Sequence, residues 1–369
     1  ETIEEPRFVD RGKVTQETFA NINAQILEIN SKTGLYPLYV VYSIYRKRCE
    51  TVNAHELTIE KQYQLWQKTV EDNIFVICKT PMAKAITRRT LLGYRKGKLN
   101  AHAFDDLIMQ LKEKPDQFKE KVLRGSFWKK ECNEMKFDAV VGNPPYQIMD
   151  GGHGSSSQPI YNVFVEMSQL LKPSYLSMIM PSRWMTGGKG LDAFRYKMIN
   201  DKHLRVLHDY LSAQACFSSV QIEGGICYFL WDKNNEGKCK LYSHLTNGTV
   251  SYSEMYLNEL NTDVLIRDQG IISILKKVHN GNIKTFDSLV FPRNAFGIFD
   301  IPSTAYATNS IEAKYAILGR FDNKRAIRYL NNSFNIFKNL DLAETWKVFI
   351  SKADGAAGQI GNPIPARII

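Results

Sequence analysis

The chain has 369 residues, 44% of them hydrophobic and 23% charged, a composition that suits one large α/β domain and a second, smaller one. Its formal net charge of +10 favours a polyanionic partner. No apolar run approaches the ~20 residues of a membrane helix, and six scattered cysteines, without a C-x-x-C pair or histidine cluster, favour reduced thiols over a metal site or disulfides.

In chain order, the charged N-terminus lacks a signal-peptide core, so we expect a cytoplasmic protein without a membrane partner. Short apolar runs then alternate with helical patterns, which is typical of βαβ units and a parallel sheet. The pattern predicts strands over 25–30, 73–79 and 137–142, and a helix over 81–92. The third strand ends abruptly at an Asn-Pro-Pro sequence.

The next segments continue this pattern. An apolar helical face over 163–171 ends at Lys172-Pro173, and strands are predicted over 175–180, 204–211 and 225–231. Strands that are apolar along their whole length indicate a sheet covered on both faces.

From about Asn234 the pattern becomes less regular, with a helix over 271–278 and prolines that punctuate loops. We therefore expect a domain boundary between Trp231 and Gly270. We divide the chain into residues 1–245 and 246–369.

The strongest motif is Asn143-Pro144-Pro145-Tyr146, directly after a strand, where open α/β sheets bind ligands. The Asn143 side chain offers one acceptor, Pro144 offers a carbonyl without a competing N–H, and Pro145 stiffens the turn. Two acceptors aimed at the two hydrogens of adenine N6 would favour a pyramidal nitrogen with a freed lone pair. Tyr146 offers a face for a base that has left the duplex.

The alternative interpretation of this motif is a rigid turn or a proline-rich docking site. Docking sites of that kind normally lie in exposed, disordered segments, whereas this motif follows a buried strand.

The run FDAVVGNPPYQ resembles the catalytic motif of amino-group DNA methyltransferases, in particular the gamma-type adenine-N6 enzymes of restriction–modification systems. The resemblance implies an α/β fold with a Rossmann-like sheet that is S-adenosylmethionine-dependent, and a smaller C-terminal α+β region. It implies a methyltransferase domain over 1–245 and a target-recognition domain over 246–369. The cofactor would be S-adenosylmethionine and the substrate a flipped-out adenine of double-stranded DNA. Nuclease, helicase or specificity parts of the same larger polypeptide would be further partners.

The resemblance also implies a cofactor site. The family's first motif, an acid and a glycine-rich turn, matches residues 28–34, so that Glu28 would hold the cofactor's amino group and Gly34 would allow close backbone approach. The implied cofactor-binding set is completed by Asn30, Thr33, Cys78, Thr15 and Phe164. An ordinary helix start accounts for Thr15 equally well, and Phe164 also occupies a core position.

Three positions depart from the family pattern. Lys32 stands where the family has a glycine, Cys78 where an acid binds the ribose, and Ser126 where an acid lies near the cofactor's adenine. A second hypothesis is therefore a DNA-recognition module on a methylase-like scaffold with a degenerate cofactor site. A third keeps the chemistry and changes the substrate to RNA or to the glutamine amide of a protein.

Further residues follow from the same resemblance. Phe217 matches an aromatic that sandwiches the flipped base opposite Tyr146, although a core aromatic fits the pattern as well. Arg183 and Lys189 are assigned to DNA binding, with Arg183 expected to reach a phosphate. The glycine-rich loop 151–157 is either a lid that orders on DNA or a plain insertion.

Overall fold

The computed structural model describes residues 12–148, 158–188, 190–217, 222, 224–259, 262 and 264–278, shorter stretches between 290 and 349, and 367–368. By its internal contacts the chain forms two units, Glu1–Val278 and His279–Ile369. The first unit thus extends beyond the division at 245/246 expected from the sequence, and the assignment of 246–369 to target recognition stays a prediction. Within the described residues, no helix is both long and apolar enough to span a membrane.

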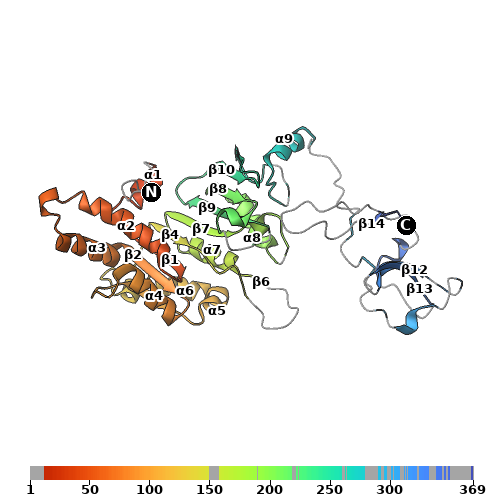
Figure 1. Ribbon diagram of the computed structural model, residues 1–369, viewed down its shortest axis with the longest axis horizontal. Helices are drawn as coiled ribbons and strands as arrows, with labels where there is room; N and C mark the ends of the chain where they lie inside the picture. Colours follow the sequence, from red (N-terminus) through yellow and green to blue (C-terminus); the bar gives the residue numbers. More distant parts are fainter. Residues whose placement is uncertain are drawn as a thin grey trace. The chain divides into compact units, whose positions relative to one another are not determined.

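One large sheet organises the described part of the first unit (Figure 1). Its strand order is β11-β10-β8-β9-β7-β4-β1-β2-β3. The strands are β1 (Ile26–Ser31), β2 (Ile74–Cys78), β3 (Asn100–Ala103), β4 (Ala139–Gly142), β7 (Tyr175–Pro181), β8 (Leu204–Tyr210), β9 (Ile226–Asp232), β10 (Cys239–His244) and β11 (Val250–Met255). β9 runs antiparallel to β7 and β8, β11 runs antiparallel to β10, and the other neighbours are parallel. The mixed α/β class with a mostly parallel sheet is confirmed.

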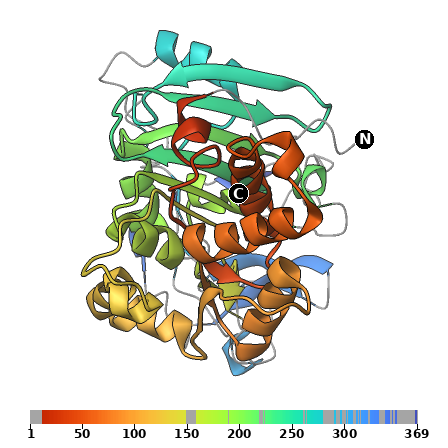
Figure 2. The same ribbon diagram turned by 90° about the vertical axis from the view of Figure 1, so that its left-hand side faces the viewer.

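Helices cover both faces of this sheet (Figure 2). One face packs against α2 (Leu35–Cys49), α3 (Ile59–Asn73) and α4 (Pro81–Leu92). The other packs against α5 (Leu107–Glu113), α6 (Pro115–Leu123), α7 (Tyr161–Leu170) and α8 (Asp192–Asn200). The remaining described helices are α1 (Lys13–Glu17) and α9 (Gln269–Val278).

Short strands complete the description. β5 (Gln147–Ile148) pairs with β6 (Gln158–Pro159) just after the Asn-Pro-Pro-Tyr motif. In the second unit β12 (Tyr315–Phe321) and β13 (Lys324–Leu330) form an antiparallel pair, as do β14 (Val348–Phe349) and β15 (Arg367–Ile368).

Alternation along β1 explains why both faces are apolar. Leu27 and Ile29 join the core under α5–α8, whereas Ile26 joins the core under α2–α4. Because successive strand side chains point to opposite faces, Glu28 shares the face of Ile26. The acid therefore enters an apolar layer.

The turn after β1 requires its glycine. Gly34 has φ +77° at the start of α2, a left-handed conformation that other residues rarely adopt. A Cβ there would lie 3.0 Å from the Thr87 Cα of α4. Gly34 thus permits the close packing of α4 against the turn.

The strand order reverses between β1 and β4. The chain adds β2 and β3 on one side of β1 and then crosses to β4 on the other. In open α/β sheets, ligands bind outside the carboxyl ends of the strands at such a switch point. Residues that follow β1, β2, β3 and β4 are therefore the candidates for a site.

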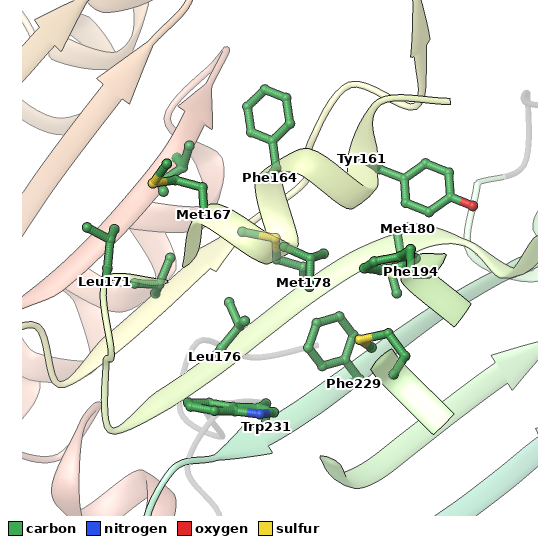
Figure 3. Packing of buried hydrophobic residues seen from close by; sticks show 14 of the residues in the cluster. Tyr161, Phe164, Met167, Leu171, Leu176, Met178, Met180, Phe194, Phe229 and Trp231 are labelled. Carbon is green, nitrogen blue, oxygen red and sulfur yellow. The ribbon is translucent and has the colours of Figure 1, made fainter. Parts of the chain in front are cut away.

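Phe164 of α7 is fully buried in the core, where it lies among Tyr161, Met167 and Met178 (Figure 3). This core lies on the sheet face opposite the one that Glu28 shares. The position favours a packing role, and its assignment to cofactor binding stays a prediction.

We expect Phe164→Leu to lower the free energy of unfolding by about 1–2 kcal/mol, because a buried ring is replaced by a smaller side chain. S-adenosylmethionine affinity should stay unchanged. Urea unfolding and calorimetric titration measure the two effects, and a loss of affinity without a loss of stability would contradict the packing role.

Candidate functional site

The Asn-Pro-Pro-Tyr motif leaves the sheet at the carboxyl end of β4. A Cβ on Gly142, the last residue of β4, would lie 3.0 Å from the Ile29 carbonyl oxygen, so the strand end packs tightly against β1. Asn143 is half-buried and Pro144 is buried. The motif is therefore held by the neighbouring strand.

Asn30 ties the end of β1 to this motif. Its side-chain Nδ2 donates to the Asn143 carbonyl oxygen at 3.4 Å. Asn30 is buried and has φ +71°, a left-handed conformation that asparagine tolerates better than most residues. The side chain that the sequence analysis assigned to cofactor binding thus contacts the Asn-Pro-Pro-Tyr motif in this structure.

Two phenols lie beside the Asn143 side chain. Burial raises the pKa of Tyr36 and of Tyr146, and the nearby Asn143 carboxamide opposes that rise in both. The Tyr146 hydroxyl is buried and forms no hydrogen bond of normal geometry within the described residues. Asn143 therefore lies near the Tyr146 hydroxyl without a fully formed bond.

The segment before Phe217 reaches the same group of phenols. The thiol of Cys216 contributes to the raised pKa values of Tyr36, Tyr146 and Tyr228, although burial contributes most in each case. Phe217 follows directly, is half-buried, and donates its backbone N–H to the Ala213 carbonyl at 2.9 Å. The fold thus brings its segment to Tyr146, and its stacking role stays a prediction.

A cavity of about 670 Å³ lies beside the motif, a size typical of small-molecule sites. Gly142 and Tyr36 line it on the side of the motif, and β4, β7 and β9 form its floor. Val14, Thr18 and Phe19, in and after α1, close another side. Thr15 is itself buried in α1. The cavity thus reaches Gly142, the residue directly before the tetrapeptide, while the four motif residues are not part of its lining.

Glu28 is the most perturbed acid of the site. Only 4% of the residue is exposed, and burial raises the pKa of its carboxyl to about 7 even though a hydrogen bond with Ser31 lowers it. Its Oε2 is buried and has no hydrogen-bond partner among the described residues. A bound cation would supply the missing partner of this carboxylate.

Cys78 ends β2 where the family has an acid. It is fully buried, and burial raises its thiol pKa to about 12, against a smaller lowering effect of the nearby Thr87 hydroxyl. A neutral thiol that faces α4 is a poor acceptor for ribose hydroxyls.

An acid that the sequence analysis missed follows β3. Asp105 is exposed, and the preceding Phe104 N–H donates to the Cys78 carbonyl at 3.0 Å, which places the segment next to the end of β2. Ser126, in contrast, lies in a later 3₁₀ turn, Gly125–Trp128. The Asp-Asp pair could have indicated this acid, but it follows a short strand that the sequence analysis did not predict.

Lys32 and Thr33, in the turn between β1 and α2, are exposed to solvent. Lys32 is exposed, which separates its charge from the buried Glu28. Thr33 is also exposed, and its carbonyl accepts from the Thr90 hydroxyl of α4. The lysine at the glycine position therefore does not fill the space beside Glu28.

Arg183 lies in the 3₁₀ turn Ser182–Met185 after β7, half-buried and close enough to Tyr161 to lower the phenol's pKa against the larger effect of burial. It thus occupies the carboxyl edge of the sheet, and phosphate binding by Arg183 stays a prediction. Lys189 and residues 151–157 lie outside the described residues.

A buried ion pair that the sequence analysis missed lies at the carboxyl edge of the sheet. Asp209 of β8 accepts two bonds from Arg267, at 2.6 and 2.7 Å, and one from the Ser182 hydroxyl at 2.6 Å. Arg267 also donates to the Gly224 carbonyl at 2.7 Å. The signal was an acidic residue inside the strand predicted over 204–211.

Part of this chain matches a known protein family. Residues 72–217 match the model of the Eco57I restriction-modification methylase family. An uncharacterized adenine-specific methylase of Mycoplasma pneumoniae is 35% identical over 116 residues, which are 31% of this chain and 28% of that protein. The chain therefore spans little more than a quarter of the curated relative that it matches.

Solved structures of restriction–modification proteins resemble the chain at low identity. A structure of a type I restriction–modification system has 16% identity and a TM-score of 0.42, and covers 64% of this chain and 44% of that one. The type IIG restriction endonuclease BpuSI has 13% identity and a TM-score of 0.43, and covers 73% and 33%. The segment with the Asn-Pro-Pro-Tyr motif thus matches the Eco57I restriction-modification methylases, which confirms the resemblance drawn from that motif.

Proposed function

We propose that this chain carries a DNA methyltransferase that places a methyl group on N6 of a flipped-out adenine within a restriction–modification system. The observation that carries this proposal is the position of Asn143, Pro144 and Tyr146. They follow β4 at the switch point of the sheet, directly after Gly142, which lines a cavity, and β4 pairs with the strand that carries the buried Glu28. The match of residues 72–217 to restriction-modification methylases and the net charge of +10 support a nucleic-acid substrate.

The chain's own residues act on the base. Tyr146 stacks on the extruded adenine, with Phe217 on its other side, which compensates for the stacking lost when the base leaves the duplex. Asn143 and Pro144 accept hydrogen bonds from the two N6 hydrogens through the carboxamide and the backbone carbonyl. Both acceptors hold N6 pyramidal and aim its lone pair. Catalysis then rests on positioning and hydrogen bonding.

Glu28, Gly34 and Asp105 would hold S-adenosylmethionine, which supplies a methyl group activated by a sulfonium. Glu28 suits the cofactor's ammonium because its Oε2 is buried without a partner among the described residues. Gly34 has no side chain and would let the cofactor approach the backbone of this turn closely. Asp105, exposed at the carboxyl end of β3, offers an acceptor for the adenosine part that Cys78 and Ser126 do not. The roles of Asn30, Thr33 and Thr15 toward the cofactor remain part of this proposal, whereas Phe164 is assigned to packing because it is buried in the core of the opposite sheet face.

The proposal is tested by incubating the chain with radiolabelled S-adenosylmethionine and unmethylated genomic DNA, followed by nucleoside analysis. We expect label in N6-methyladenine. Label in N4-methylcytosine would contradict the base assignment, and label in added RNA or protein but not in DNA would contradict the substrate class.

The alternative is a DNA-recognition module on a methylase-like scaffold, which the buried thiol of Cys78 favours. The two functions differ in cofactor binding. Calorimetric titration with S-adenosylmethionine should give heat that disappears in Glu28→Ala, and the absence of heat with wild-type protein would support the alternative.

A further inference from the structure

The ion pair between Arg267 and Asp209 joins the ends of three neighbouring strands. Asp209 is fully buried one residue before the end of β8, and Ser182, which donates its hydroxyl to Asp209, follows β7 directly. The Ser182 N–H donates to the Gly225 carbonyl oxygen at 3.1 Å, just before β9 begins. Because β9 runs antiparallel to β7 and β8, its start lies at their carboxyl ends. Arg267 is therefore bonded where all three strands meet.

The Arg267 side chain holds both ends of the connection between β8 and β9, residues 211–225. Its Nε and one terminal nitrogen donate to Asp209 in β8, and its other terminal nitrogen donates to the Gly224 carbonyl oxygen at 2.7 Å, two residues before β9. The planar guanidinium presents its N–H groups in fixed, diverging directions, so one side chain makes all three bonds. The two ends approach closely, since a Cβ on Gly225 would clash with the carbonyl oxygen of the last residue of β8.

The segment that carries Arg267 is anchored by backbone bonds as well. The Leu265 N–H donates to the Met185 carbonyl oxygen at 2.8 Å, in the 3₁₀ turn after β7. The Ser243 hydroxyl donates to the carbonyl oxygen of Arg267 itself at 2.9 Å. The guanidinium therefore projects from a fixed backbone toward the connection.

The connection carries Phe217, the aromatic that the proposed function places opposite Tyr146. The Leu211 N–H donates to the His244 carbonyl oxygen at 3.2 Å, and the Phe217 N–H donates to the Ala213 carbonyl oxygen at 2.9 Å. These bonds tie Phe217 to the end of β8, where Arg267 binds. The position of the ring thus depends on how firmly the two ends of the connection are held.

We propose that Arg267 is a positioning residue, which holds the connection between β8 and β9 so that Phe217 stacks on the flipped-out base. This inference rests on the proposed methyl transfer. Arg267 lies outside residues 72–217, which match the methylase family, and beyond the division at 245/246 expected from the sequence. The part of the chain assigned to target recognition thus also shapes the half of the site that receives the base.

The first test measures how well the connection is held, by labelling thiols with N-ethylmaleimide. Arg267→Lys keeps a positive charge beside Asp209, but one ammonium cannot replace the three bonds of the guanidinium. Cys216, half-buried and directly before Phe217, should then react about fivefold faster, because the connection opens more often. Cys132, which is exposed, should react at an unchanged rate. Peptide mass spectrometry measures both rates, and an unchanged rate at Cys216 would overturn the inference.

The second test asks whether Arg267 acts through Phe217. On unmethylated genomic DNA, Arg267→Lys should lower kcat roughly tenfold and leave the KM for S-adenosylmethionine within about twofold, because the ring is misplaced while the cofactor site is untouched. In a Phe217→Ala background the same substitution should change kcat less than about twofold, since no ring remains to be positioned. An equal loss in both backgrounds would mean that Arg267 acts in another way, and the inference would fail.

Arg48→Lys is the matched control. Arg48 of α2 is also buried, donates to the Ile22 carbonyl oxygen at 2.8 Å and pairs with Asp72 at 3.3 Å, near the amino ends of β1 and β2. Its substitution should leave the labelling of Cys216 and kcat within about twofold of wild type. Faster labelling of Cys216 in this variant, equal to that of Arg267→Lys, would indicate general loosening of the fold and refute the role of Arg267.

The labelling rate does not depend on methyl transfer, so the two proposals fail separately. A wild-type protein that methylates no adenine refutes the proposed function. A wild-type protein that methylates adenine, with an Arg267→Lys variant of equal labelling rate and equal kcat, refutes only the role of Arg267.

Discussion

Asn143→Ala is expected to lower the rate of adenine methylation by about a thousandfold, the upper range for the loss of one aimed hydrogen-bonding group at a reacting centre. Without the carboxamide, one of the two N6 hydrogens has no acceptor, so the nitrogen lone pair stays delocalised into the ring. DNA affinity should change less than about twofold, because phosphate contacts supply most of it. Single-turnover methylation and filter binding measure the two quantities.

Asn143→Asp provides the matched comparison. It keeps oxygen acceptors at the same position and should retain at least about tenfold more activity than the alanine variant. Equal activity in both variants would show that the acceptor at this position is not what accelerates the reaction. Full activity in Asn143→Ala would refute the assignment of the motif.

The sheet was largely predictable because its strands are buried on both faces. β1, β2, β7 and β9 were each placed to within one or two residues, since a continuous apolar run between turn signals is typical of a strand covered on both sides. β3 was missed because Asn100–Ala103 is short and contains a histidine and an asparagine. Because β3 was not predicted, Asp105 was not recognised, and Ser126 was matched to the acid of the family pattern instead.

The target-base half of the site was predictable from Asn143–Tyr146 because the motif is local in sequence. Tyr36 was missed because its place in the cavity wall depends on the three-dimensional meeting of α2 with the end of β4. Asn30 shows the same limit, since its contact with Asn143 joins residues far apart in the chain. Contacts of this kind depend on strand order, which a strand pattern does not specify.

Glu28→Gln is expected to make the protein more stable at neutral and alkaline pH. The folded-state pKa of Glu28 is about 7, against 4.5 for an exposed carboxyl. Below about pH 4.5 the carboxyl is protonated in both states and the substitution should have little effect. Between the two pKa values the unfolded chain ionises first, so wild-type stability falls as pH rises. Above about pH 7 the full difference remains, about 3 kcal/mol.

This cost is informative because a cation bound beside Glu28, as proposed for S-adenosylmethionine, would offset it. S-adenosylmethionine should stabilise wild type against urea by more than it stabilises Glu28→Gln, and the difference should grow with pH as the carboxylate ionises. Glu120→Gln, an exposed acid of α6, is the control and should change neither profile. Urea unfolding at about pH 4 and about pH 8, with and without cofactor, measures both effects. Equal stability of wild type and Glu28→Gln at about pH 8 would mean that the buried carboxylate is already compensated, and the argument for an ammonium beside it would fail.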